Sequence, residues 1–142
     1  MSSLILNNST YRKEEISMIK VDSYPCFESG VLIDDDFISA CIWNHVGQQY
    51  QKKVTHYLSG ELFLQDVDQY SKDIFIYVDW YLKATLDGLE LTKKLSGLGF
   101  KNIVVTTNSY DVKLEDLPWV KAVIQKDPPW NLNLLLGVRD EE

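Results

Sequence analysis

Acidic residues directly follow two of the most apolar segments of this sequence. Asp34-Asp35-Asp36 come after Val31-Leu32-Ile33, and Asp79 comes after the run that spans residues 74–78. Lys126 lies just beyond a third apolar segment. Carboxylates can bind a hard divalent cation, act as covalent nucleophiles or cap helices, and the fold decides which role they take.

A parallel sheet would bring these residues together, because ligands bind beyond the carboxyl ends of its strands. Several carboxylates in one crevice repel each other, and one of them is driven to bind a proton. Magnesium removes this repulsion, since it is usually held by one or two carboxylates with waters and a phosphate. Lys126 offers a positive charge to phosphate or carboxylate, and the Thr107 hydroxyl can hydrogen-bond a phosphoryl oxygen.

Each candidate residue also has an ordinary structural interpretation. Asp34-Asp35-Asp36 can simply begin a helix, because Asp caps helices and suits their positive end. Asp79 can be a turn residue, and Lys126 an ordinary surface lysine. Thr106 replaces Thr107 in the crevice if the strand register differs by one residue. The coincidence of acids and lysine at matching strand ends favours the metal-binding interpretation.

Strands and helices are predicted to alternate along the chain. The predicted strands are residues 31–33, 54–58, 74–78, 103–105 and 122–124. The predicted helices are 37–46 with Gly47 as the stop, 62–70, a third carrying Leu91, Leu95 and Leu98 before a Gly99 cap, and a last one carrying Leu132, Leu135 and Leu136. We therefore predict an α/β fold, a doubly wound five-stranded parallel sheet with the flavodoxin-like strand order 2-1-3-4-5.

The length and charge of the chain limit its class. Its 142 residues suit one compact domain, which we place at residues 29–142 after a partly extended or flexible leader, residues 1–28. The net charge of −7 argues against a nucleic-acid partner, because phosphate backbones require a basic face.

The cysteines, the longest apolar run and the histidines give no sign of a metal site, a disulfide or a membrane span. Cys26 and Cys41 are not spaced as metal ligands or as a disulfide framework, which indicates reduced thiols. The longest apolar run is too short to span a bilayer, so we expect no membrane association and a cytoplasmic location. His45 and His56 lack partner ligands at metal spacing, and we interpret them as structural or surface residues.

Residues 30–130 resemble a response-regulator receiver domain of two-component signalling. The matching pieces are Leu32-Ile33-Asp34-Asp35-Asp36, Ile76-Tyr77-Val78-Asp79-Trp80, Asp87-Gly88-Leu89-Glu90-Leu91, Val104-Val105-Thr106-Thr107 and Lys126-Asp127-Pro128. Their order and separations are close to those of the family, although no single piece is specific. The stretches from Leu32 to Trp43 and from Lys126 to Trp130 also resemble receivers at the C-termini of bacterial hybrid histidine kinases.

This resemblance implies a role for each candidate residue. Asp79 would accept the phosphoryl group, without enzyme activity beyond its own phosphorylation and dephosphorylation. The implied magnesium ligands are the side chains of Asp34, Asp35 and Asp79 and the backbone carbonyl of Tyr81. The residues implied to contact the phosphoryl group are Thr107 and Lys126. The donor would be a histidine kinase or a phosphotransfer protein, and the signal would pass through protein–protein contacts.

Several positions depart from the family pattern. Lys83 stands near the usual proline of the loop after the phosphoacceptor, Asn108 replaces a small residue, and Val123 replaces an aromatic one. The segment before Lys126 is short, which predicts a fourth helix reduced to a turn. These changes fall on the usual output face and favour an alternative, a receiver-like binding module that works without phosphorylation. A phosphatase is disfavoured because Tyr81 occupies the place of its second aspartate. The sequence leaves a homodimer open.

Overall fold

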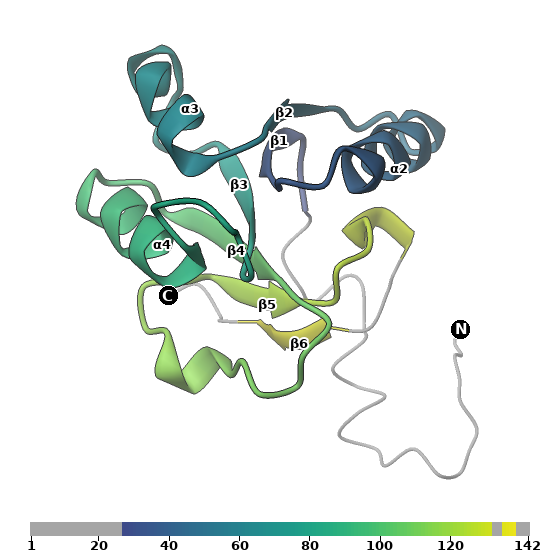
Figure 1. Cartoon of the computed structure of the whole chain (residues 1–142). Coiled ribbons are helices and arrows are strands. Elements are labelled where there is room, and N and C mark those ends of the chain that lie inside the picture. Colours follow the sequence, from purple (N-terminus) through teal and green to yellow (C-terminus); the bar gives the residue numbers. More distant parts are fainter. Residues whose placement is uncertain (1–26, 132–134, 139–142) are drawn as a thin grey trace, which may run out of the picture.

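The computed structural model describes residues 27–131 and 135–138, and its centre is a six-stranded sheet (Figure 1). The strands are β1 (Gly30–Ile33), β2 (Val54–Tyr57), β3 (Phe75–Asp79), β4 (Asn102–Thr106), β5 (Ala122–Ile124) and β6 (Leu135–Val138). The helices are α2 (Phe37–Gln49), α3 (Gly60–Gln65) and α4 (Gly88–Gly97), with short 3₁₀ helices at Val67–Gln69, Leu114–Asp116 and Pro129–Asn131.

The first five strands run parallel in the order β2-β1-β3-β4-β5, which confirms the predicted fold class and strand order. Apolar, mostly β-branched residues fill β1, β3 and β4, as expected for strands that are covered on both faces. The pairing of Ile33 with Val78 puts the residues after β1 and at the end of β3 side by side. Asp79 in turn pairs with Thr106 of β4.

The predicted last helix is wrong. Pro129–Asn131 forms only a 3₁₀ turn, and β6 (Leu135–Val138) then runs antiparallel to β5. A short apolar run cannot be assigned to helix or strand by its periodicity alone, and the free edge of β5 decides the assignment here. Leu132, which was assigned to that helix, lies outside the described residues.

Helices cover both faces of the sheet, α2 on one side and α3 and α4 on the other (Figure 1), and a separate hydrophobic core lies on each side. On one face α2 places Trp43 against Tyr77 and Trp130, with ring centroids 5.0 and 5.6 Å away. On the other face α3 and α4 bury Phe63 and Leu91. Alternation along β3 sends Ile76 and Val78 to the α4 side, and Tyr77 and Asp79 to the α2 side.

The predicted element boundaries are mostly close to the observed ones. α2 continues through Gly47 to Gln49, and the second helix is split into α3 and the 3₁₀ helix Val67–Gln69. Gly99 adopts a φ of 100°, the left-handed conformation predicted for the cap of α4. The connection from β4 to β5 contains only the 3₁₀ helix Leu114–Asp116, as the short segment predicted.

The first described residue, Phe27, is anchored to the sheet. Phe27 is buried and packs edge-on against Phe75, and its carbonyl accepts a hydrogen bond from the Trp130 indole. The rest of the predicted leader, residues 1–26, lies outside the described residues. In the described ranges, no helix has both the length and the apolar character needed to cross a membrane.

Candidate functional site

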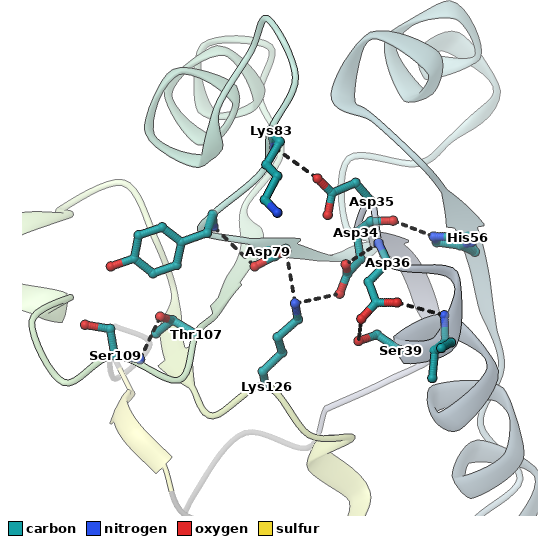
Figure 2. Close-up of polar contacts among 12 residues, drawn as sticks. Asp34, Asp35, Asp36, Ser39, His56, Asp79, Lys83, Thr107, Ser109 and Lys126 are labelled. Carbon is teal, nitrogen blue, oxygen red and sulfur yellow. Dashed lines mark hydrogen bonds and ion pairs between the residues drawn. The ribbon is translucent and has the colours of Figure 1, made fainter.

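Three carboxylates meet at the carboxyl end of the sheet. Asp34 follows β1 and is fully buried, Asp79 ends β3 and is 2% exposed, and Asp35 is exposed at the rim. One carboxylate oxygen from each lies within 4.8 Å of those of the other two, close enough to share one cation. Figure 2 shows Asp34 and Asp79 pointing toward one another across the end of the two strands.

The three consecutive aspartates have different local roles. Asp34 accepts a hydrogen bond from the Asp36 N–H at 2.9 Å, which folds the turn after β1. Asp36 caps α2, because its carboxylate accepts from the Ile38 N–H at 2.9 Å and from the Ser39 hydroxyl at 3.2 Å. The Ile38 N–H is also the main cause of a lowered pKa at Asp36. The helix-cap interpretation therefore applies to Asp36, whereas Asp34 and Asp35 face the pocket.

Lys126 joins the two buried acids. Its ammonium Nζ lies 3.2 Å from Asp79 Oδ2 and 3.6 Å from Asp34 Oδ2 (Figure 2). Burial disfavours the charged ammonium, but the negative charges of Asp79 and Asp34 outweigh it and raise the pKa of Lys126. The lysine is thus held in its charged form between the two carboxylates.

The negative charge of the buried Asp34 carboxylate is only partly balanced by Lys126. Its Oδ2 is buried and accepts no hydrogen bond from any described residue. The pKa of Asp34 is raised from 3.8 to about 6, mainly by burial and also by the negative charge of Asp79, against the opposing effects of the Asp36 N–H and Lys126. A buried oxygen without a donor, next to two other carboxylates, is the ligand set that fits a hard cation such as Mg²⁺.

The loop from β3 to α4, residues 80–87, is held by carboxylates at both ends. The Tyr81 N–H donates to Asp79 Oδ1 at 3.2 Å, and the Lys83 N–H donates to Asp35 Oδ2 at 3.1 Å. A proline at position 83 could not make the second bond, because it has no N–H. Leu86 donates its N–H to Glu61 Oε2 at 2.9 Å. The Tyr81 carbonyl as a metal ligand stays a prediction.

Thr107 lies at the same end of the sheet, but its hydroxyl is engaged elsewhere. Thr107 Oγ1 accepts from the Ser109 N–H at 3.0 Å (Figure 2), and the Thr107 N–H donates to the Ile124 carbonyl. Thr106 is also fully buried, and its Oγ1 has no hydrogen-bond partner among the described residues. The hydroxyl oxygen of Thr107 is thus held by the Ser109 N–H, while its proton stays free to donate.

Sequence reasoning gave His56 no specific contact. Its Nε2 lies 2.6 Å from the carbonyl oxygen of Asp34, and its ring lies 6.4 Å from that of Phe37. Because a carbonyl can only accept, Nε2 carries the proton and steadies the turn after β1. The structural role predicted for His56 agrees with this contact. Its position at the end of β2 was the one sequence signal that places it beside the site.

The nearby carboxylate of Glu61 was also missed by the sequence reasoning. Glu61 lies in the first turn of α3, where an acid is expected to favour the positive helix end. Its Oε1 is buried without a hydrogen-bond partner among the described residues, while Oε2 anchors the β3–α4 loop. A contact with a backbone N–H 25 residues away leaves no mark in the sequence.

Comparison with known proteins identifies no relative of this chain. No family model matches it, and neither does any curated protein or solved structure. The function of the chain is therefore inferred from the chemistry of the side-chain cluster formed by Asp34, Asp35, Asp79 and Lys126.

Proposed function

We propose that this chain is a phosphoacceptor domain of the response-regulator receiver type, with Asp79 as the residue that is phosphorylated. One observation carries the proposal. Asp34, Asp35 and Asp79 offer oxygens within 4.8 Å of one another, and Lys126 Nζ reaches both buried acids. The sheet order 2-1-3-4-5, which places these strand ends together, supports the same assignment.

The transfer uses the Asp79 carboxylate as a nucleophile. A carboxylate oxygen attacks the phosphorus of a donor, a new P–O bond forms, and the bond from phosphorus to the leaving group breaks. The leaving group departs with the electron pair and takes a proton from solvent when it is an imidazole. The Tyr81 N–H on Oδ1 and Lys126 on Oδ2 orient the two oxygens of Asp79 before the attack.

Magnesium is the proposed cofactor. Asp34, Asp35, Asp79 and the Tyr81 carbonyl are the groups that would hold it, and the buried Oδ2 of Asp34, which accepts no hydrogen bond from a described residue, supports this assignment. When bound, the cation neutralises phosphoryl oxygens that would otherwise face three carboxylates. The Lys83 N–H keeps Asp35 turned toward the β3–α4 loop and the pocket.

Lys126 and Thr107 would recognise the phosphoryl group after transfer. A phosphoryl group adds about −1.5 to −2 charges at neutral pH, which attracts the ammonium away from Asp34. The Thr107 hydroxyl would leave the Ser109 N–H and donate to a phosphoryl oxygen. These two local movements would change the surface around the β4–β5 connection and alter protein–protein contacts.

The proposed donor is a histidine kinase or a phosphotransfer protein in the cytoplasm. The support is the resemblance of the residues after β1, β3, β4 and β5 to the receiver pattern. The proposal includes no activity on other substrates. It also includes no nucleic-acid partner, in keeping with the net charge of −7.

Acetyl phosphate with Mg²⁺ tests this proposal directly. Intact-mass measurement should show one added phosphoryl group on the full-length chain and none when EDTA replaces Mg²⁺. Asp79→Asn should remain unmodified. Asp36→Asn is the matched control, because Asn caps α2 equally well and the variant should be modified like the natural chain. An unmodified natural chain, or an Asp79→Asn variant modified to the same extent, would refute the proposal.

A second candidate function is a receiver-like module that binds its partner without phosphorylation. The observation that favours it is the β4–β5 connection, where a 3₁₀ helix replaces a full helix and Thr107 is bonded to Ser109. This candidate predicts that partner binding is the same for the natural chain and for Asp79→Asn. Altered binding by the variant would count against it.

A further inference from the structure

The outer face of α2 is apolar and exposed to solvent. Phe37, Ile38 and Ile42 are 67%, 68% and 49% exposed, and Cys41 is an exposed free thiol among them. The residues that α2 buries against the sheet are instead Ala40, Trp43 and Gly47. We call the exposed set Phe37, Ile38, Cys41 and Ile42 the α2 face. Contiguous apolar groups of this kind on a soluble domain mark an interaction surface.

The charge pattern around the α2 face narrows the choice of partner. None of the 13 residues of α2 is Asp, Glu, Lys or Arg, although the chain carries a net charge of −7. The exposed Asp35 and Asp36 lie at the N-terminal end of α2. Lys52 and Lys53 follow its C-terminal end, where Glu28 pairs with Lys52 at 2.9 Å. One end of this surface is therefore negative, the middle is neutral, and the other end has an excess of positive charge.

We propose that the α2 face binds the α2 face of a second copy of this chain in an antiparallel, two-fold symmetric pair. Antiparallel packing puts the acidic end of each helix against the lysine end of the other, and it aligns the helix dipoles favourably. In this register the symmetry axis passes near residue 44, so Cys41 and Ile42 of the two copies meet close to the axis. Phe37 and Ile38 of each copy then pack toward the C-terminal end of the other helix. This inference does not depend on phosphorylation of Asp79.

Other occupants match this pattern less well. A basic helix would complement the acidic end but meet the lysines at the other end, and an acidic helix would have the opposite mismatch. The net charge of −7 opposes the association of two copies, so a surface whose two ends carry opposite charge is favoured for the contact. Only a partner with the reversed order of charges fits both ends, and a second copy in antiparallel orientation provides it.

The size of the surface limits the strength of the pair. A helix of 13 residues is about 20 Å long, and two such helices pack with their axes roughly 8–10 Å apart. Such a contact buries less than the roughly 800 Å² per partner of a standard interface. We therefore expect a reversible dimer with a dissociation constant in the micromolar range rather than a permanent one.

Sedimentation velocity of the full-length chain over a concentration series tests the dimer. The natural chain should change from monomer to dimer as its concentration rises. Ile42→Glu should raise the dissociation constant at least about tenfold, because it puts two like charges near the symmetry axis. Leu62→Glu is the matched control, since Leu62 is 44% exposed on α3 on the opposite side of the sheet, and it should dimerise normally.

A charge substitution tests the orientation of the two helices, and cross-linking tests whether the two α2 faces meet. Lys53→Glu should weaken the dimer, because it removes the positive end, and added salt should weaken the natural dimer as well. In a Cys26→Ser background, a short bismaleimide should link Cys41 of the two copies. Cross-linking should fall on dilution and in the Ile42→Glu variant.

The remaining outcomes overturn the inference. A natural chain that stays monomeric at high concentration would show that a different partner, or residues 1–26 of the same chain, covers the α2 face. A dimer that survives Ile42→Glu, or is lost equally with Leu62→Glu, would show that α2 is not the contact. A dimer without the Cys41 cross-link would show that the two α2 faces do not meet, and a dimer that Lys53→Glu leaves unchanged would exclude the antiparallel arrangement.

Discussion

At the scale of single residues, three adjacent aspartates take three different environments. Asp36 is solvent-exposed and caps α2, Asp35 lies at the pocket rim, and Asp34 is buried beside Asp79. Burial raises the pKa of Asp34, whereas the Ile38 N–H hydrogen bond lowers the pKa of Asp36. Of these three aspartates, Asp34 is therefore the one whose ionisation should lower the stability of the fold.

Asp34 makes the protein less stable as the pH rises without a divalent cation. Its pKa is about 6 in the folded chain and close to 3.8 when unfolded, so the folded state binds more protons between these values. The favourable contribution is complete below pH 3.8 and is lost as the pH rises through 6, at a cost on the order of 3 kcal/mol.

Urea unfolding in EDTA at several pH values should resolve this contribution. Between pH 4 and pH 6, the free energy of unfolding should decrease less for Asp34→Asn than for the natural chain, because Asn cannot ionise. Mg²⁺ should restore stability to the natural chain above pH 6, since it binds the ionised carboxylate. Parallel pH curves for the two proteins would contradict the assignment.

Removal of the Lys126 ammonium should both destabilise the chain and tighten magnesium binding. Lys126→Ala leaves Asp34 and Asp79 without their cation, which we expect to cost about 1–3 kcal/mol in EDTA. The more negative pocket should then bind Mg²⁺ more tightly in calorimetric titration. Lys101→Ala is the control, because its pair with Asp73 is exposed and worth about 0–1 kcal/mol. Weaker magnesium binding by Lys126→Ala would contradict this account.

At the scale of elements, the loop between β3 and α4 positions the pocket. It begins at Asp79, gives its N–H groups to Asp79, Asp35 and Glu61, and closes where Gly88 starts α4. A Cβ at Gly88 would lie 2.4 Å from the Trp80 carbonyl oxygen. The backbone at Gly88 therefore approaches the backbone at Trp80 more closely than a residue with a side chain would allow. The geometry of the Asp34, Asp35 and Asp79 cluster thus depends on a glycine outside the cluster.

Gly88→Ala should disturb both stability and the metal site. The added methyl group overlaps the Trp80 carbonyl, and we expect a loss of about 1–3 kcal/mol in the free energy of unfolding. Gly97→Ala is the matched control in the same helix. Nothing lies within 4 Å of its Cβ, so it should be neutral or stabilise by about 0.4–1 kcal/mol. Urea unfolding and Mg²⁺ titration of both variants measure the difference, and equal effects would refute it.

The elements also show what sequence reasoning can reach. Continuous apolar runs predicted β1, β3 and β4, because a strand that is buried on both faces is apolar at successive positions. The same reasoning failed at β6, where a short leucine-rich run fits a helix and a strand equally well. It found α2 but not its buried side, since Phe37 and Ile42 have helical spacing and yet face solvent.

At the scale of the whole molecule, sheet topology assembles the site from distant segments. The predicted strand ends brought Asp34, Asp79 and Lys126 together because strand order and direction alone fix those positions. The contacts of His56, Glu61 and the Lys83 N–H depended on loop conformation, which periodicity does not encode.

The most direct test of the central claim is a crystal structure of the chain with Mg²⁺ and beryllofluoride, which mimics a phosphoryl group on a carboxylate. The account predicts beryllium bonded to an Asp79 carboxylate oxygen, with Mg²⁺ held by Asp34, Asp35 and Asp79. Lys126 and the Thr107 hydroxyl should contact the fluorides. Beryllofluoride bound elsewhere, or a pocket in which Lys126 stays between Asp34 and Asp79 with no metal, would contradict it.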